Sequence, residues 1–250
     1  METLVILFIG FFVIATFYSS VGFGGGSSYL AVLSLFAFSF FFIRSHALIC
    51  NLVVVSGSTL LYVKKGHFQI KRFLPFIMTS IPLTFIGALF KLEEYIFFII
   101  LGFTLILAAF FLVLQTLQKK AVNTKTYPSY LSYILGGAIG FISGLVGIGG
   151  GIFLAPLLHY LRWGTAMQIA ALAAFFILVN SISGLAGLFV KDTLELSWSH
   201  TLVLIAAVFL GGQLGVRFSL KKASPNAIRI GTAILVFIVA LRILITKGFV

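Results

Sequence analysis

The chain has 250 residues, of which 61% are hydrophobic and only 9% are charged. Soluble domains are about half apolar and about a quarter charged, so this composition excludes a soluble protein and indicates an integral membrane protein. The long unbroken apolar runs favour membrane helices over the short alternating strands of a barrel. The formal net charge of +12 does not indicate a nucleic-acid partner, because the basic residues stand in short loops, where they set topology and contact anionic lipid.

Two further features limit the chemistry of the chain. The single cysteine, Cys50, excludes an internal disulfide and a cysteine-rich metal site, and we expect no metal and no cofactor. Residues 1–18 lack a basic leading region and a clear cleavage site, so we interpret them as a retained membrane segment. The longest polar connection leaves no room for an ATPase, so energy would come from an ion gradient, the substrate gradient or a separate subunit.

Five apolar segments precede a polar linker and five follow it. Their approximate bounds are 4–21, 29–43, 47–63, 73–90 and 95–117, then 131–146, 152–161, 169–190, 201–216 and 228–245. We therefore expect an all-α integral membrane protein with a first membrane repeat over 1–117, a basic cytoplasmic linker over 118–129 (with Lys119, Lys120 and Lys125) and a second repeat over 130–250. A full crossing needs about 20 apolar residues. The second and seventh segments are shorter, which favours broken or re-entrant helices at these positions. We therefore expect roughly 8–10 hydrophobic segments, the short ones included.

One glycine string occurs in each half. Residues 21–26 read VGFGGG and residues 146–151 read VGIGGG, half the chain apart, and each string separates a long apolar segment from a short one. Each third segment also contains a Ser-Gly pair and an asparagine, Asn51 or Asn180, although the two asparagines align only with a gap of a few residues. The repetition predicts a duplicated fold with a site where the halves meet.

Equivalent loops of the two halves carry opposite charges. Loop 64–72 is basic, and its counterpart 191–195 has two acidic residues and one lysine. The next loop reverses the pattern, because 91–94 has two glutamates whereas 217–229 has four basic residues. The positive-inside rule then places matching loops on opposite sides of the membrane. We expect inverted-topology repeats in the plasma membrane, with both termini outside, rather than a parallel repeat, which would place like charges in matching loops.

The glycine strings have two interpretations. Glycines pack membrane helices closely, and six are expected to do so: Gly136, Gly137, Gly140, Gly144, Gly211 and Gly212. Where a helix breaks, however, exposed N–H groups and the helix dipole favour an anion. The candidate substrate-binding residues are Gly24, Gly25, Gly26, Ser27, Ser28, Gly149, Gly150, Gly151, Ile152, Asn51 and Asn180. A nucleotide site is not indicated, because neither string matches G-x-G-x-x-G or continues into a P-loop lysine.

Three basic side chains are candidates for proton coupling or anion attraction: Arg44, His46 and His159. Each is also explained as an ordinary interfacial residue at a segment end. The two asparagines could equally join helices or bind ligand. No carboxylate lies inside an apolar segment, which argues against a carboxylate proton relay or cation path and suits an anionic substrate.

The doubled VG[FI]GGG string, with GIFLAPL following in the second copy, resembles the sulfite exporter TauE/SafE family over essentially the whole chain. The first copy departs from it, since Ala31 stands where the second has Pro156. The resemblance implies a secondary transporter, an exporter of small sulfur-containing anions such as sulfite or organosulfonates, and not an enzyme. An anion channel and a non-transporting membrane subunit are the alternatives, and the oligomeric state is left open.

Overall fold

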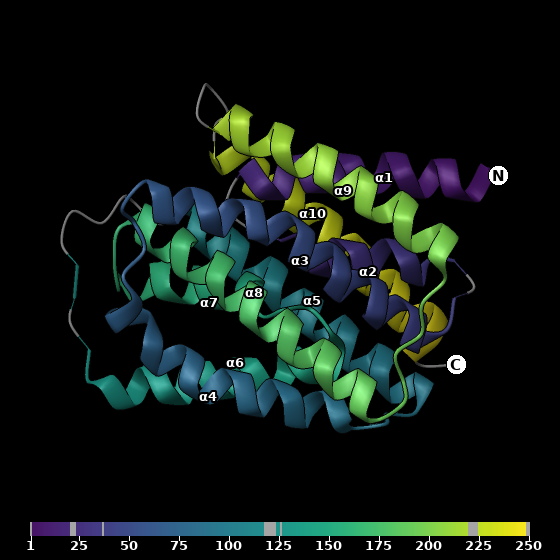
Figure 1. Cartoon of the computed structure of the whole chain (residues 1–250), viewed down its shortest axis with the longest axis horizontal. Coiled ribbons are helices and arrows are strands. Elements are labelled where there is room, and N and C mark those ends of the chain that lie inside the picture. Colours follow the sequence, from purple (N-terminus) through teal and green to yellow (C-terminus); the bar gives the residue numbers. More distant parts are fainter. Residues whose placement is uncertain are drawn as a thin grey trace.

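The computed structural model describes residues 2–20, 24–36, 38–117, 124–125, 127–219 and 225–248, and in these ranges every regular element is a helix. Residues 21–23 of the first glycine string and Lys119 and Lys120 of the linker lie outside them. The helices are α1 (Glu2–Ser20), α2 (Gly26–Ser34), α3 (Phe40–Lys64), α4 (Ile70–Leu89), α5 (Glu94–Leu117), α6 (Ser129–Val146), α7 (Gly151–Tyr160), α8 (Ala166–Val190), α9 (Trp198–Ser219) and α10 (Pro225–Ile243), and a π-helical turn, Leu244–Gly248, follows the last (Figure 1).

The described helices confirm a multi-pass helical membrane protein. Seven of them are long and apolar enough to cross a bilayer. By contrast, α2 has nine residues and α7 has ten, which is about 14–15 Å at 1.5 Å per residue, or about half of a 30 Å hydrocarbon core. One long helix, one short helix and three long helices follow each other in both halves of the chain.

The boundary between the second and third segments differs from the predicted one. The sequence predicted an apolar segment up to residue 43, whereas α2 ends at Ser34 and α3 begins at Phe40. The Ser39 hydroxyl starts α3 by accepting a hydrogen bond from the Phe42 N–H at 3.1 Å. Arg44 and His46 therefore lie inside a membrane helix, where both are 1% exposed, and not in a loop.

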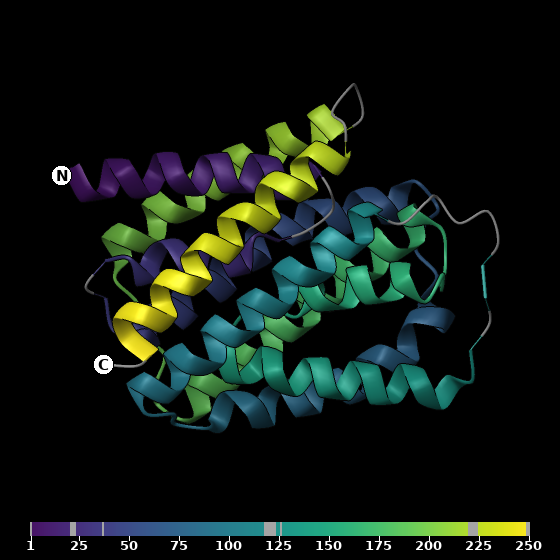
Figure 2. The ribbon, with the colours of Figure 1, turned by 180° about the vertical axis from the view of Figure 1, so that it is seen from behind.

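The loops gather at two opposite ends of the molecule. At one end Arg72 Nη2 donates to the Trp163 carbonyl at 3.0 Å, and the Lys125 N–H donates to the Arg162 carbonyl at 2.9 Å. At the other end lie the α2–α3, α4–α5 and α8–α9 loops, together with the starting end of α1 and the last turn of α10 (Figures 1 and 2). There the Ser39 hydroxyl donates to the Glu195 carboxylate. Loop 64–72, at the first end, thus has basic residues and no acidic one, whereas the loops at the second end carry four acidic residues beside Lys91 and Lys191.

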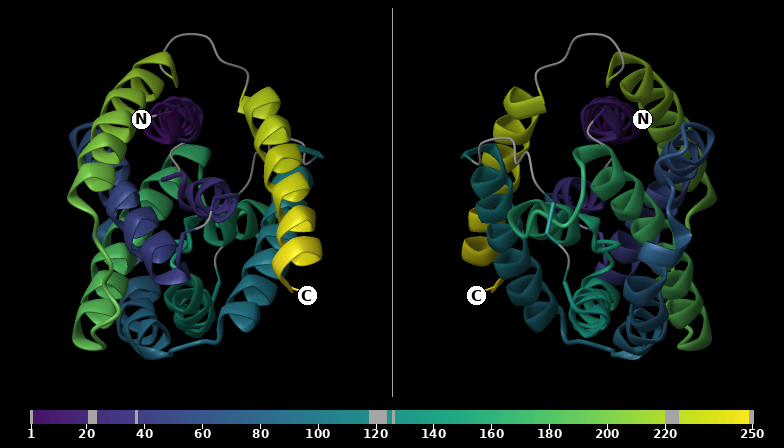
Figure 3. Two further views of the ribbon diagram at one scale, coloured as in Figure 1. Left: turned by 90° about the vertical axis from the view of Figure 1, so that its right-hand side faces the viewer. Right: turned by 90° about the vertical axis from the view of Figure 1, so that its left-hand side faces the viewer.

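Close helix contacts hold the outer helices together. A Cβ on Gly140 would lie 2.7 Å from Ser80 Cα, and one on Gly144 would lie 2.1 Å from the Thr84 carbonyl, so α6 approaches α4 at glycine distance. Gly211 brings α9 equally close to α1, at Phe12. These contacts confirm the predicted packing role of these glycines. Seen end-on, the short helix α2 lies enclosed by the longer helices (Figure 3), and all of its residues except Val32 are buried.

Candidate functional site

The first glycine turn starts α2 in the interior of the molecule. Gly25 is the N-cap of α2 and has a φ of 91°. Its backbone is left-handed, and a Cβ there would lie 2.8 Å from the Tyr29 ring, so only glycine fits. The hydroxyls of Ser27 and Ser28 are buried and face Tyr18 of α1: the Tyr18 and Ser28 hydroxyl oxygens are 2.6 Å apart. The two predicted serines therefore bind α1.

The second glycine turn joins the end of α6 to the start of α7. Gly147, Gly149 and Gly150 all have positive φ, at 84°, 84° and 81°. Gly150 is the N-cap of α7, and a Cβ there would lie 2.8 Å from the Phe176 ring. Three left-handed residues within four positions reverse the chain sharply, which is why the string requires glycine. The whole turn, 147–150, is buried.

The Asn51 carboxamide of α3 lies between the two turns. Its Nδ2 donates to the Ile148 carbonyl of the second turn at 3.0 Å. Its Oδ1 would lie 2.6 Å from a Cβ on Gly24 of the first turn, and its Nδ2 would lie 2.4 Å from one on Gly26. A Cβ on Gly26 would itself lie 2.6 Å from the Ile148 carbonyl oxygen. The start of α2 and the turn before α7 thus touch each other at one buried amide.

Arg44 supplies a buried positive charge beside the second turn. Its Nη2 donates to the Gly144 carbonyl in the last turn of α6 at 2.8 Å, and its Cβ and Cγ pack on Gly147. Within the described part of the chain, Nε and Nη1 have no hydrogen-bond partner. All five acidic residues of the chain are exposed, so no carboxylate compensates this guanidinium. An uncompensated buried charge is costly unless a counter-charge binds beside it.

Several polar side chains that the sequence did not single out lie near the same turn. Ser181 Oγ would lie 3.3 Å from a Cβ on Gly149, and Ser143 Cβ would lie 3.4 Å from one on Gly150. Neither serine hydroxyl has a partner among the described residues. Their sequence positions gave a usable signal, because Ser143 stands one turn before the second string and Ser181 follows Asn180 directly.

The two predicted asparagines have different environments. Asn180 of α8 accepts a hydrogen bond from the Thr84 hydroxyl at 3.1 Å, and its Nδ2 is buried without a partner among the described residues. Both α3 and α8 have 25 residues and begin after a capping hydroxyl, Ser39 or Thr165. Counted from these caps, the position in α8 that matches Asn51 is Ile177, which touches Gly149 and Gly151. Asn51 and Asn180 therefore stand at different positions in their helices, in keeping with the gap of a few residues by which they align in the sequence.

The two candidate histidines lie away from the turns. His46 Nδ1 donates to the Phe42 carbonyl at 2.9 Å, and its Nε2 lies 3.0 Å from the Thr201 hydroxyl of α9. His159 lies in the last turn of α7, next to the loop that binds the linker through Arg162. The structure thus joins Arg44 to the second glycine turn, whereas His46 faces α9 and His159 lies at the basic end of the molecule.

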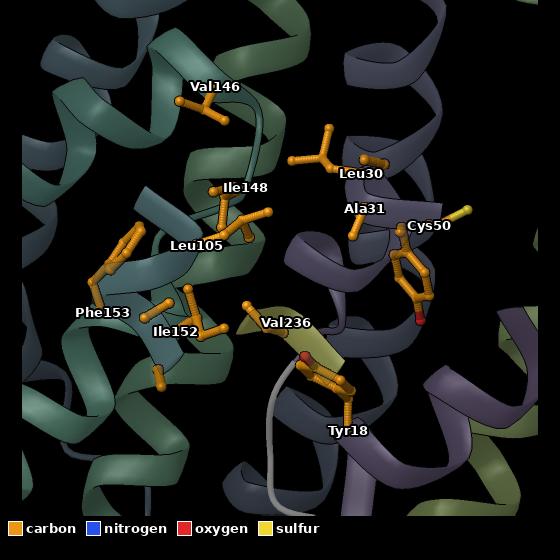
Figure 4. Close-up of a cluster of buried hydrophobic side chains, with 14 of the residues drawn as sticks. Tyr18, Leu30, Ala31, Cys50, Leu105, Val146, Ile148, Ile152, Phe153 and Val236 are labelled. Carbon is orange, nitrogen blue, oxygen red and sulfur yellow. The ribbon is translucent and has the colours of Figure 1, made fainter. Parts of the chain in front are cut away.

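Apolar side chains surround the polar centre. Ile152, predicted as a site residue, is 5% exposed and belongs with Ile148 and Leu30 to one cluster of buried hydrophobic residues (Figure 4). Such surroundings strengthen electrostatic interactions and make each unpaired polar group costly. The arrangement offers one fixed positive charge, several donors and one amide oxygen inside an apolar shell.

The sequence is similar to those of known membrane proteins. The chain is 34% identical over 242 residues, 95% of this chain and 97% of the relative, to a protein of Sinorhizobium fredii (strain NBRC 101917 / NGR234) named "probable membrane transporter protein y4hK". It is 26% identical over 201 residues, 73% of each chain, to "probable membrane transporter protein YunE" of Bacillus subtilis (strain 168). No solved structure matches it significantly. The model of the family "Sulfite exporter TauE/SafE" matches residues 6–243, and the chain therefore belongs to this family of membrane transporters.

Proposed function

We propose that the chain is a secondary transporter that exports small sulfur-containing anions, such as sulfite or organosulfonates, and binds them between the first residues of α2 and α7. One observation carries the proposal: Asn51 touches both glycine turns, next to the buried and uncompensated Arg44. The family name and the relatives' names support a transporter, and the buried cation supports an anionic cargo.

The backbone at the two turns favours an anion as well. Each short helix begins at a glycine N-cap without a side-chain hydrogen bond to its first N–H groups. The N-terminus of a helix carries partial positive charge, and glycine lets a ligand approach the backbone closely. Two half-length helices that begin in the interior of a membrane protein are the layout in which many secondary transporters hold substrate.

Several contacts support two inverted halves that exchange access between the two sides. The first helix of the second half, α6, packs on α4, and the first helix of the first half, α1, packs on α9. The short helices run to opposite ends, α2 towards the Glu195 loop and α7 towards the Arg162 loop. With the basic end in the cytoplasm, both termini would lie outside the plasma membrane. Alternating access would then expose the two turns to each side in succession.

Reconstituted protein tests this function. Purified protein in proteoliposomes is loaded with radiolabelled sulfite, thiosulfate, sulfate or a sulfonate, and flux is measured with and without a pH gradient. We expect saturable flux of at least one sulfur anion and accumulation against its own gradient when a driving ion gradient is imposed. Flux that runs only down the anion's own electrochemical gradient would favour an anion channel. No flux of any anion would favour a non-transporting subunit.

A further inference from the structure

The unpaired polar atoms of the buried centre fall into three kinds. Arg44 Nε and Nη1 can only donate hydrogen bonds, the hydroxyls of Tyr29, Ser143 and Ser181 can donate or accept, and Asn51 Oδ1 can only accept. None has a partner within the described residues. Each such atom destabilises the protein when it is buried without a hydrogen bond. A ligand that fits must therefore accept several hydrogen bonds and also donate one.

The charge of the ligand follows from Arg44. Among the described residues, this guanidinium is the one charged side chain that contacts either turn, at Gly147, and its hydrogen-bond partner is the neutral Gly144 carbonyl. One positive charge in an apolar surrounding is matched by one negative charge. A second negative charge would be buried without compensation, so a dianion is disfavoured by the same physics.

The donor on the ligand follows from Asn51. Its amide orientation is fixed by the bond from Nδ2 to the Ile148 carbonyl, so Oδ1 faces the first turn at Gly24. Arg44 and Asn51 stand seven positions apart on α3, which places them on the same helix face. They contact consecutive residues of the second turn, Gly147 and Ile148. One small ligand between the turns can therefore meet both side chains.

We infer that the substrate is bound as a monoanion that keeps one O–H group, with its charge on Arg44 and its O–H donated to Asn51 Oδ1. This inference rests on the proposed anion transport, adds the protonation state of the cargo, and favours hydrogensulfite over organosulfonates, whose sulfonate group has no O–H. A partly protonated oxyanion carries its proton across on itself. Proton coupling then needs no titratable relay in the protein, in agreement with the exposure of all five carboxylates.

Titratable groups of the protein surround the centre and must be separated from those of the ligand. Cys50 and His46 lie on α3, Tyr29 lies on α2, and His200 and Glu195 lie beyond His46 on and before α9. In the described part of the chain, none of these groups forms a hydrogen bond with Arg44 or Asn51. A probe whose own charge is constant with pH reports any effect of these protein groups.

Methylphosphonate and methanesulfonate form a matched pair of probes. Both are small tetrahedral anions with one methyl group, and below its second ionisation methylphosphonate has the same single charge but keeps one O–H. Binding to the purified protein in nanodiscs is measured by calorimetry across that ionisation. We expect the methylphosphonate monoanion to bind about tenfold more tightly than methanesulfonate, a difference of one hydrogen bond. Its apparent affinity should fall about tenfold per pH unit above the ionisation, as the competent species is depleted, while methanesulfonate binding stays constant.

Variants assign the preference to its residues. Asn51→Leu should bind both probes equally, because the acceptor is lost while the charge remains, and Arg44→Met should bind neither. Equal binding of the two probes by the wild-type protein, or affinity that rises as methylphosphonate becomes a dianion, would overturn the inference while leaving anion transport intact. Absence of binding and flux for every anion tested would instead overturn the proposed function. Comparing the affinities of the two probes for the wild-type protein tests the inference even if Asn51→Leu does not fold.

Discussion

The Asn51 carboxamide donates to the Ile148 carbonyl at 3.0 Å, and this bond joins the first half of the chain to the glycine turn of the second. Asn51 also lies against Gly24 and Gly26 of the first turn. A single side chain thus contacts both places where the membrane helices are interrupted. Because both turns contact Asn51, we expect a substitution in one turn to alter the packing of the other.

Replacing Asn51 with alanine should destabilise this junction. The Ile148 carbonyl would lose its buried donor, which costs about 1–3 kcal/mol. Thermal unfolding of the purified protein in detergent measures the loss, and anion flux should fall at least tenfold. Ser56→Ala is the matched control on the same helix, because the Ser56 hydroxyl bonds only the Leu52 carbonyl one turn earlier. Equal unfolding temperatures for Asn51→Ala and Ser56→Ala would contradict the bridging role.

Removing the buried charge should separate stability from transport. Arg44→Met keeps an extended side chain beside Gly147 but removes an uncompensated cation, and replacement of buried charges by apolar groups is often neutral or stabilising. We expect an unchanged or higher unfolding temperature together with loss of anion flux. If Arg44 served only to bind the end of α6 at Gly144, the variant would be less stable and the remaining folded protein would still transport. Arg72→Gln, at the basic end, is the control for a general effect of lost charge.

The left-handed glycines predict a sharp contrast between two similar substitutions. Gly150→Ala places a Cβ at a φ of 81° and 2.8 Å from the Phe176 ring, which should cost upwards of about 1–2 kcal/mol. Gly10→Ala in α1 meets nothing within 4 Å and should be neutral or slightly stabilising. Unfolding temperature and flux, measured side by side, check both. A harmless Gly150→Ala would show that the second turn does not need its observed conformation.

Much of this fold follows from the sequence, for a physical reason. A membrane helix satisfies its own backbone and needs only a long apolar run, so the order of the ten α-helices in the described ranges could be predicted, and their number to within roughly 8–10. The start of α3 could not, because the apolar run continues through Phe40 and Ile43, and only the Ser39 cap shows the break. Arg44 therefore looked like an interfacial residue at a segment end, although it is buried inside α3.

The residues of the candidate site could be predicted from the sequence less completely than the helices. The glycine strings identified both turns because three adjacent glycines have few other uses in an apolar chain. Ser143 and Ser181 were missed, because their proximity to Gly150 and Gly149 depends on how α6 and α8 pack. The roles of Asn51 and Asn180 differ for the same reason, since tertiary register decides which amide reaches the turns.

The orientation in the membrane can be tested with introduced cysteines. Cys50 is buried and should not react, so the wild-type chain is its own blank. With the basic end in the cytoplasm, Glu93→Cys should react with a membrane-impermeant maleimide in intact cells, whereas Lys65→Cys should react only after permeabilisation. The reverse pattern would place the termini inside. Reaction of both cysteines from one side would contradict the arrangement of the loops at two ends.

The role of His46 can be separated from that of the substrate's own proton. His46 bonds the Phe42 carbonyl and lies 3.0 Å from the Thr201 hydroxyl, away from both turns. If the proton travels on the substrate, His46→Gln should change the flux rate at most a few-fold and leave the pH dependence of sulfite flux unchanged. A pH profile that becomes flat in this variant would assign the coupling to His46.

The most direct test of the central claim compares sulfite flux in proteoliposomes containing wild-type protein with flux in those containing Arg44→Met. The account predicts saturable sulfite flux in the wild type and flux at the level of empty liposomes in the variant, with an equal amount of folded protein in both. Undiminished flux in a folded Arg44→Met protein would contradict the assignment of the anion to the buried centre between α2 and α7.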